Sequence, residues 1–261
     1  MPSLTGIVIE LGLAEHLVGV TSYCSRPECA DLPKVGTQFA PDYERVVGLR
    51  PDVVLVEKAH SEVVDRYTKL GVPTLVLPTD SIEGVYESIG AVGERFGKVD
   101  EARALIHRMQ SKFDEVRSRV KGAKPVRTLL ILGLDGDSLR QLFAVGGGNF
   151  MDQMVKIAGG ENVLADAAID YPRLSKELVV QRSPEAIVVI AEPRKNNADL
   201  FAAQKNLWAD LATVDAVRND RIYLVDGPQV LLPSPDMPTT AERIARALHP
   251  ERWEKSKNDA N

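Results

Sequence analysis

Apolar residues recur at alternating spacings of three and four positions between residues 99 and 121. The apolar members of this run are Val99, Ala102, Ile106, Met109, Phe113, Val116 and Val120. This spacing places them on one stripe of a helix whose opposite face is charged. At about 1.5 Å per residue the helix would be roughly 34 Å long. We predict that its Val99, Ile106, Met109 and Phe113 stripe packs on two flanking lobes; half of a coiled coil is the alternative.

Short apolar runs alternate with helical patterns on both sides of this helix, and this alternation is typical of parallel sheets. The strands are expected at 16–20, 52–56, 74–77, 127–132, 142–145, 186–190 and 221–225. The helices are expected at 4–11, 43–49, 61–70, 81–96, 150–158, 175–181, 199–211 and 239–248. The sequence therefore predicts an α/β protein with two Rossmann-like lobes. The expected parts are an N-terminal lobe at 1–97, a connecting helix at 98–122, a C-terminal lobe at 123–250 and a polar tail at 251–261.

One unit of sequence occurs once in each predicted lobe. Glu44 precedes Pro51 by seven positions, and Glu177 precedes Pro184 by seven positions, with two valines between the members of each pair. The proline ends a helix, and an acidic residue then leads into a continuous apolar run. Continuous apolar runs predict strands buried on both faces. The repeat favours related local geometry in the two lobes.

Composition excludes some classes of function. The net charge is -5 at pH 7, and no run of basic residues stands out, so we expect no nucleic-acid partner. No window reaches the apolar length of a membrane span. A helical pattern begins almost at Met1, and the sequence shows no basic region followed by the short apolar stretch that is typical of a signal peptide. From this pattern we expect either a cytoplasmic protein or a chain whose natural start lies further upstream.

The chain has two cysteines, Cys24 and Cys29. They could form a small loop disulfide or remain two free thiols, and the sequence leaves both alternatives open. A metal site is disfavoured because zinc sites use four ligands and no histidine or cysteine cluster supplies the others. No catalytic signature is present: Gly146, Gly147 and Gly148 lack the spacing of a phosphate-binding loop. We therefore expect neither an enzyme nor a resident cofactor.

Chemically capable residues follow the predicted strands, at the edge where open α/β sheets bind ligands. In the first lobe these are Tyr23, Cys24, Glu57, Lys58 and His60. In the second lobe they are Asp135, Asp137, Tyr171, Arg173, Glu192, Arg194, Asp226 and Gln229. We predict that Tyr23, Glu57, Tyr171, Arg173 and Asp226 border a ligand site. Asp135 and Asp137 are open to a cation, although solvated loop acids are the simpler interpretation.

Several segments together resemble the solute-binding proteins that feed vitamin B12 and ferric-siderophore ABC importers. They are Val18-Gly-Val-Thr-Ser-Tyr-Cys24, Leu32-Pro-Lys-Val-Gly36, Leu49-Arg-Pro-Asp52, Ala158-Gly-Gly-Glu-Asn-Val163 and Tyr171-Pro172. The resemblance covers nearly the whole chain and is strongest to cobalamin binders. It implies a class III periplasmic-binding-protein fold, in which one long backbone helix joins two lobes that hold the ligand. Matching family positions imply that Glu44 and Glu177 dock on the two membrane subunits of an importer.

The resemblance also leaves alternatives open. Aromatic residues make up 5% of the chain, so a related corrinoid, a ferric siderophore or haem stands beside cobalamin as the ligand. The family begins with a strand before the segment that matches Pro2-Ser-Leu-Thr, so we expect this first strand to be missing here and the natural gene product to be longer. The resemblance also implies a monomeric, extracytoplasmic protein. An intracellular corrinoid sensor or scavenger is a second hypothesis. A nitrogenase-like or chelatase-like enzyme is a third, but both cysteines lie in one predicted lobe, which argues against a cluster between lobes.

Overall fold

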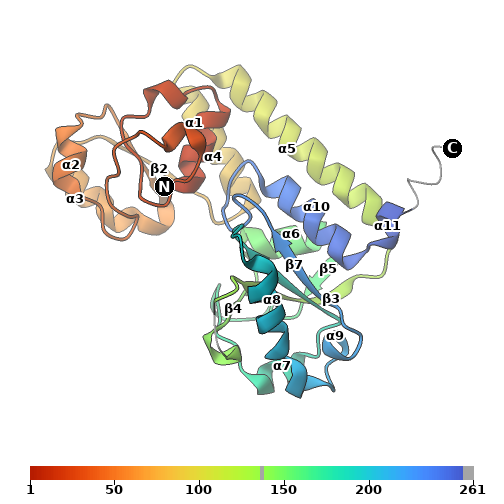
Figure 1. Cartoon of the computed structure of the whole chain (residues 1–261). Coiled ribbons are helices and arrows are strands. Elements are labelled where there is room, and N and C mark those ends of the chain that lie inside the picture. The colour runs from red at the N-terminus through yellow and green to blue at the C-terminus, as the bar shows by residue number, and fades with distance from the viewer. Residues whose placement is uncertain (136–137, 255–261) are drawn as a thin grey trace. The chain divides into compact units, whose positions relative to one another are not determined.

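A computed structural model describes residues 1–135 and 138–254 of the chain. The chain divides into two compact units (Figure 1). Unit 1 comprises residues 1–109 and 232–235, and unit 2 comprises residues 110–231 and those from 236 onward. Each unit has parallel strands that alternate with helices, as the sequence predicts. The division falls inside the long helix.

The long helix is α5, Val99–Val120, which agrees closely with the predicted run. Acidic residues occupy its first turn and arginines its last turn, which complements the helix dipole. Its buried stripe consists of Ala102, Leu105, Met109, Phe113, Val116 and Val120. The predicted stripe was wrong at two positions, because Val99 is 45% exposed and Ile106 is half-buried. Leu105, one position before Ile106, takes the central place.

Unit 1 contains a two-stranded parallel sheet of β1 (Val54–Glu57) and β2 (Thr74–Leu77). Its helices are α1 (Pro2–Glu10), α2 (Tyr43–Gly48), α3 (Val64–Lys69) and α4 (Ile82–Arg95). Short 3₁₀ turns lie at Ala14–His16, Pro27–Cys29 and Lys58–Val63. Two small clusters form part of its core. One contains Val46, Val56, Val63, Tyr67 and Val72, and the other contains Val20, Cys24 and Cys29.

Two expectations for unit 1 were wrong. Residues 16–20 do not form a strand, since the segment makes a single parallel bridge between Val20 and Lys34. β1 is not buried on both faces, because Val56 alone among its residues is fully buried. A parallel strand is buried on both sides only when it has neighbours and covering helices, and β1 has one neighbouring strand in the described residues.

Unit 2 contains a five-stranded sheet with the order β4-β3-β6-β7, and β5 also pairs with β3. The strands are β3 (Val126–Leu132), β4 (Phe143–Ala144), β5 (Gly160–Asn162), β6 (Ala186–Ala191) and β7 (Ile222–Asp226). The pairs β3–β6 and β6–β7 are parallel, whereas β4 runs antiparallel to β3. The all-parallel expectation was therefore wrong at β4, and β5 was not foreseen.

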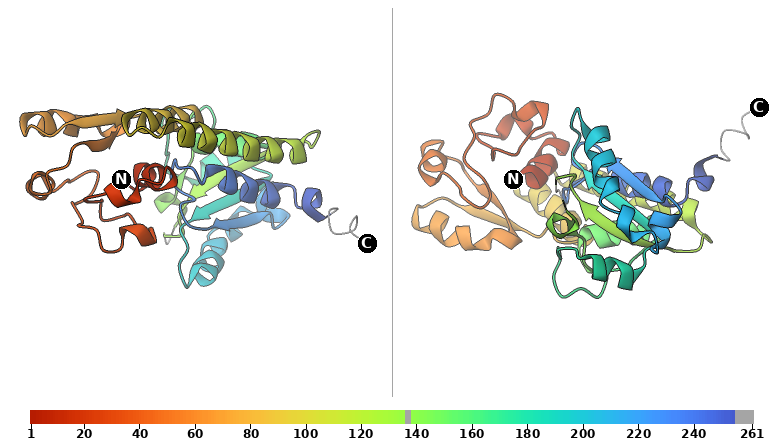
Figure 2. Two further views of the ribbon diagram at one scale, coloured as in Figure 1. Left: turned by 90° about the horizontal axis from the view of Figure 1, so that it is seen from above. Right: turned by 60° about the horizontal axis from the view of Figure 1, so that its bottom comes forward.

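Helices cover both faces of this sheet (Figure 2). They are α6 (Phe150–Ile157), α7 (Lys176–Arg182), α8 (Asn197–Asn206), α9 (Asp215–Arg218) and α10 (Met237–Leu248). Ile187 and Val189 of β6 share one core cluster with residues of α7, α9 and the 3₁₀ turn Ala209–Leu211. Every residue of β6 is buried, as its continuous apolar run predicts.

The tail expected from residue 251 begins with a short helix, α11 (Glu251–Glu254). The Trp253 ring lies 5.4 Å from the guanidinium carbon of Arg119 and 5.5 Å from that of Arg246. Cations over an aromatic face are attracted by the ring quadrupole, so these two contacts hold α11 in unit 2. Among the helices described, none is long and apolar enough to cross a membrane.

Candidate functional site

In unit 2, charged residues gather where β3, β6 and β7 end. Arg194, which follows β6, holds Asp135, which follows β3, through two bonds of 2.6 and 2.8 Å. Bidentate pairs of this kind fix the geometry of both groups. The arginine lowers the pKa of the Asp135 carboxyl, so the acid is charged at neutral pH. Asp137 lies outside the described residues.

A second group at the same sheet edge is held by Asn197. Its side-chain amide donates to the Glu192 carbonyl oxygen at 3.1 Å and to Oδ2 of Asp226 at 2.9 Å. Glu192 is half-buried, and burial raises the pKa of its carboxyl, although backbone N–H groups of Gln229 and Leu231 oppose this effect. Gln229 is buried and has a left-handed φ of 63°. Such backbone strain is concentrated at functional sites.

Arg173, also in unit 2, forms an antiparallel bridge with Phe143 of β4. Its guanidinium carbon is 4.7 Å from the centre of the Phe143 ring, and it donates a bond of 3.4 Å to the Arg140 carbonyl oxygen. Phe143 and Tyr171 are each 39% exposed. Arg173 and Phe143 therefore present a cation and a flat apolar ring side by side. The structure gives no direct contact between this pair and Asp226 among the described residues.

In unit 1, Tyr23 and Glu57 have different surroundings. Tyr23 lies in the loop after Val20 and is 60% exposed. Glu57 ends β1 and accepts a hydrogen bond from the Ser3 hydroxyl in the first turn of α1. Beyond β1, the His60 ring packs edge-on against Phe39, with ring centres 5.0 Å apart. No hydrogen bond joins Tyr23 to Glu57 in the described part of the chain.

Cys24 and Cys29 are buried free thiols in the structure. Cys24 Sγ lies 3.4 Å from the hydroxyl oxygens of Thr5 and Thr21. Burial raises the pKa of the Cys29 thiol, and the neighbouring Cys24 adds to this. The disulfide stays a prediction. No group of three or more metal-binding side chains occurs among residues 1–135 and 138–254.

Glu44 and Glu177 occupy the same place in two different helices. Each is the second residue of its helix, α2 or α7, and each is exposed. The preceding caps also match: Asp42 accepts from the N–H of Arg45, and Ser175 accepts from the N–H of Leu178. Hydrogen bonds from its own backbone N–H and from Ser175 lower the pKa of Glu177.

The ends of these two helices correspond as well. Arg50, before Pro51, has a φ of 49°, and Ser183, before Pro184, has a φ of 40°. Both residues are left-handed, and each leads through its proline into β1 or β6. The repeat seen in the sequence thus corresponds to one local structure formed twice, from the helix cap to the following strand.

Three of these residues carry no recognisable functional signal in the sequence. Asn197 is the first residue of α8 and follows Asn196 at the capping position, and asparagines at a helix start are too common to give a functional signal. Phe143 and Phe39 are single exposed aromatic residues, and such residues are common on protein surfaces. The pairing of Phe143 with Arg173 depends on an antiparallel bridge between residues 30 positions apart, which periodicity does not indicate.

Comparison with known proteins places the chain among binding proteins. The family model described as "Periplasmic binding protein" matches residues 1–228. The "Uncharacterized ABC transporter substrate-binding lipoprotein YvrC" of Bacillus subtilis is 26% identical over 260 residues, which are 97% of this chain and 79% of that protein. The "Vitamin B12-binding protein" of Yersinia pestis is 27% identical over 191 residues, which are 72% of this chain and 66% of that protein.

Solved structures agree with the fold. An ABC transporter substrate-binding protein from Listeria monocytogenes has a TM-score of 0.80 and 25% identity, with 96% of each chain covered. The periplasmic heme-binding protein RhuT from Roseiflexus sp. RS-1 also has a TM-score of 0.80 at 22% identity, with 96% of each chain covered. The predicted fold class is thereby confirmed.

Proposed function

The chain belongs to the periplasmic binding protein family, and from this premise we propose that it is the receptor of an ABC importer for a metal chelate. The observation that carries the proposal is the family match over residues 1–228, which includes most of both units. The relatives named above are described as binding proteins, and YvrC is described as a substrate-binding lipoprotein of an ABC transporter. We accordingly propose a binding function without catalysis, in a protein that works as a monomer outside the cytoplasm.

We propose cobalamin or a related corrinoid as the first candidate ligand. A corrin ring carries amide side chains, which need hydrogen-bond acceptors. Asp226 and Glu192 supply such acceptors at the carboxyl edge of the unit 2 sheet. Glu192 is half-buried, so less water competes for an amide N–H at its oxygens, whereas Asp226 is exposed at the end of β7. The Yersinia relative carries the vitamin B12 description, and this supports the same choice.

Haem is the second candidate, and a specific pair of residues favours it. Haem carries two carboxylates and a flat apolar ring. Arg173, stacked on Phe143, offers a guanidinium for a carboxylate and an aromatic face for a ring. RhuT, similar in fold, carries a heme-binding description. A ferric siderophore with carboxylate groups would use the same cation.

We propose that Glu44 and Glu177 are the docking charges for the two membrane subunits. Both are exposed at the second position of a capped helix, one in each unit. The helix dipole favours a carboxylate at this position. The dipole therefore explains a glutamate in either helix, but it does not explain why a glutamate occurs at the same position in both units. Exposed charges of this kind set the rate and register of association with a partner.

The ligand is identified by absorption titration of the purified protein with aquocobalamin, haemin and a ferric siderophore. We expect saturable binding of one equivalent for one of these chelates, with a Kd of about 1 μM or lower, equivalent to roughly -8 kcal/mol. Arg173→Ala should weaken a carboxylate-bearing chelate by about tenfold or more and leave cobalamin nearly unchanged. Asp226→Asn should weaken cobalamin more than haem.

Arg218→Ala is the matched control, since Arg218 is an exposed arginine of α9 that pairs with Asp215. It should leave every titration unchanged. The ligand site would lie elsewhere if three variants bound each chelate with wild-type affinity. These variants are Tyr171→Ala, Arg173→Ala and Asp226→Asn.

A further inference from the structure

Helices α2 and α7, labelled in Figure 1, belong to different units but present the same pair of side chains to solvent. In α2 the pair is Glu44 and Val47, and in α7 it is Glu177 and Val180. Val47 is 38% exposed and Val180 is 46% exposed, although both are aliphatic. Residues three positions apart are neighbours on the surface of a helix. Each helix therefore has one exposed face that carries a carboxylate and an apolar side chain next to each other.

The rotation of both helices is set by the valine that precedes the exposed one. Val46 is buried in a unit 1 cluster that includes Val56 of β1. Val179 is buried in the unit 2 cluster that includes Ile187 of β6. Because the same position of each helix faces the core, the same positions turn outward in both units.

The stability of its own helix does not explain an exposed valine. The branched Cβ of valine restricts the side chain in a helix, so alanine is the better helix former at an exposed position. Single exposed aliphatic residues are common, but here the neighbouring positions differ between the two helices. Arg45 corresponds to Leu178, and Gly48 corresponds to Gln181. The glutamate and the exposed valine thus recur where the residues around them do not.

The two glutamates are available to a partner. Neither Glu44 nor Glu177 is among the acidic residues that form ion pairs in the described part of the chain. Lys176, which directly precedes Glu177, is paired with Asp210 at 2.6 Å. A cationic side chain of another protein can therefore bind either glutamate without breaking an existing ion pair.

We propose, on the premise that Glu44 and Glu177 dock on an importer as stated above, that Val47 and Val180 are contact residues of the same interface. Each valine packs on an apolar surface beside the cation that binds its neighbouring glutamate. The partner must offer a cationic group with an adjoining apolar surface, and it must offer this site twice. Two copies of one membrane subunit, or two related subunits, have this property.

The charged and the apolar side chain of each face should act at different stages of docking. A carboxylate attracts a cation before contact, over a range that salt limits to about 8 Å at physiological ionic strength, and so it raises the association rate. A valine acts only at contact, where it removes apolar surface from water, and so it slows dissociation. The apolar contact also excludes water from the adjoining ion pair and strengthens it.

The test measures association and dissociation of the full chain on the cognate importer in lipid nanodiscs, by biolayer interferometry at about 50 and about 300 mM NaCl. The double variant with Val47→Ala and Val180→Ala should dissociate about tenfold faster, because two apolar contacts are lost. Its association rate should equal that of the wild type. The double variant with Glu44→Gln and Glu177→Gln should instead associate more slowly, and its association rate should lose most of its salt dependence. Each single valine variant should show part of the faster dissociation, because the two faces are equivalent.

A double variant with Val76→Ala and Val99→Ala is the matched control, since both of these valines are exposed and lie outside the repeat. It should dock as the wild type does. The variant with Val47→Ala and Val180→Ala should keep the wild-type Tm and chelate affinity, because alanine suits an exposed helical position. Faster dissociation of that variant would then arise at the interface and not from loss of folding.

Wild-type dissociation of the variant with Val47→Ala and Val180→Ala would overturn the proposal, and so would an effect confined to one of the two valines. If the glutamate variant still associates slowly in that case, the docking charges stand and only the apolar contact is wrong. If both double variants dock as the wild type does, the docking function itself is wrong.

Discussion

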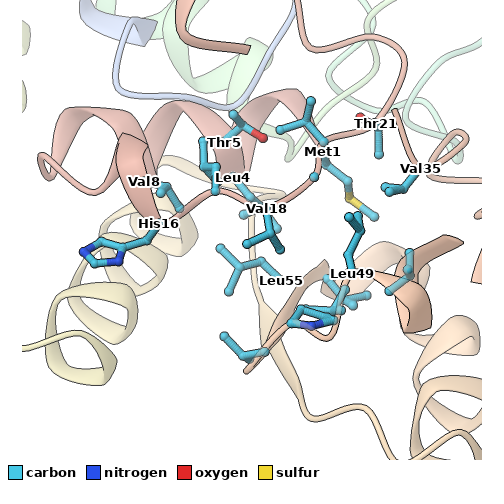
Figure 3. A pocket seen from close by; sticks show the side chains of 18 of the residues that line it. Met1, Leu4, Thr5, Val8, His16, Val18, Thr21, Val35, Leu49 and Leu55 are labelled. Atoms are coloured by element: carbon cyan, nitrogen blue, oxygen red, sulfur yellow. The ribbon is translucent and has the colours of Figure 1, made fainter. Parts of the chain in front are cut away.

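Units 1 and 2 repeat one local design but differ in how completely they bury their strands. β6 of unit 2 lies between β3 and β7 and is buried along its whole length. β1 of unit 1 has a single neighbouring strand in the described residues, and its Val54, Leu55 and Val56 line a cavity of about 720 Å³ (Figure 3). Both strands follow a capped helix, a left-handed residue and a proline. The same helix–proline–strand unit therefore serves a fully packed sheet and a partly open one.

The difference shows that the repeat fixes local backbone geometry and not burial. Trp208 is completely buried beside Ile187 and Val189 in the unit 2 cluster. In unit 1, by contrast, β1 has one neighbouring strand in the described residues, and Leu55 and Val56 of this strand line the cavity. Because buried apolar area supplies most of the stabilisation of a fold, unit 1 should be the less stable unit.

The largest effect is expected at Phe113, the buried aromatic residue of α5 in unit 2. Phe113→Ala should lower the free energy of unfolding by about 3–5 kcal/mol, because it removes a buried ring and leaves a cavity. Urea unfolding followed by tryptophan fluorescence measures this loss. Val99→Ala, at the exposed start of the same helix, is the control and should change stability by less than about 0.5 kcal/mol.

A smaller effect should distinguish two buried valines in equivalent strands. Val189→Ala in β6 should lower the free energy of unfolding by about 2 kcal/mol, whereas Val56→Ala in β1 should lower it by about 1 kcal/mol. Val56 lines the cavity, so its methyl groups make fewer contacts to lose. Equal losses in urea unfolding would show that the unit 1 core is as tightly packed as that of unit 2.

The order of unfolding can be read from two optical signals. Trp208 and Trp253, the two tryptophans, both belong to unit 2, whereas circular dichroism reports the helices of both units. If unit 1 is less stable, the dichroism should begin to fall at a lower urea concentration than the fluorescence changes. Coincident curves would indicate one cooperative transition and would contradict the contrast.

The smallest effect concerns the acidic residue after each proline. Glu185 accepts from the Arg127 N–H at 3.0 Å and from Lys124 at 2.9 Å, and these bonds lower the pKa of its carboxyl. Because the folded pKa is the lower one, the stabilisation is complete above the unfolded pKa of about 4.3 and is lost as pH falls through the folded value. Glu185→Gln should cost about 1 kcal/mol at pH 7 and little at pH 2. Asp52→Asn, at the equivalent exposed position of unit 1, should cost less than about 0.5 kcal/mol at either pH.

The sequence predicted most elements of the fold because each depended on local pattern. The α5 run, the two helix–proline–strand units and the buried β6 follow from spacing and from proline. The strand at residues 16–20 failed because its apolar residues pack in a loop cluster with Cys24 and Cys29. β4 and β5 are two and three residues long, which is too short for a periodic signal.

The candidate site was less predictable because its contacts join residues distant in the sequence. The positions of Asp226, Arg194 and Glu192 after strands were foreseen, since parallel sheets expose their carboxyl ends. The bridge that Asn197 forms between Glu192 and Asp226 spans 29 positions from residue 197 to residue 226. The stacking of Arg173 on Phe143 likewise requires an antiparallel bridge that no local pattern indicates.

We propose that this chain delivers a bound chelate to an importer through one carboxylate on each unit, Glu44 and Glu177. The most direct measurement is ATP hydrolysis by the cognate importer in lipid nanodiscs, stimulated by chelate-loaded receptor. A variant with Glu44→Ala and Glu177→Ala should bind its chelate with wild-type affinity but lose the stimulation, and each single variant should lose part of it. A control with Glu94→Ala and Glu161→Ala, two exposed acids outside the repeat, should stimulate as the wild type does. Full stimulation by the Glu44 and Glu177 double variant would contradict the account.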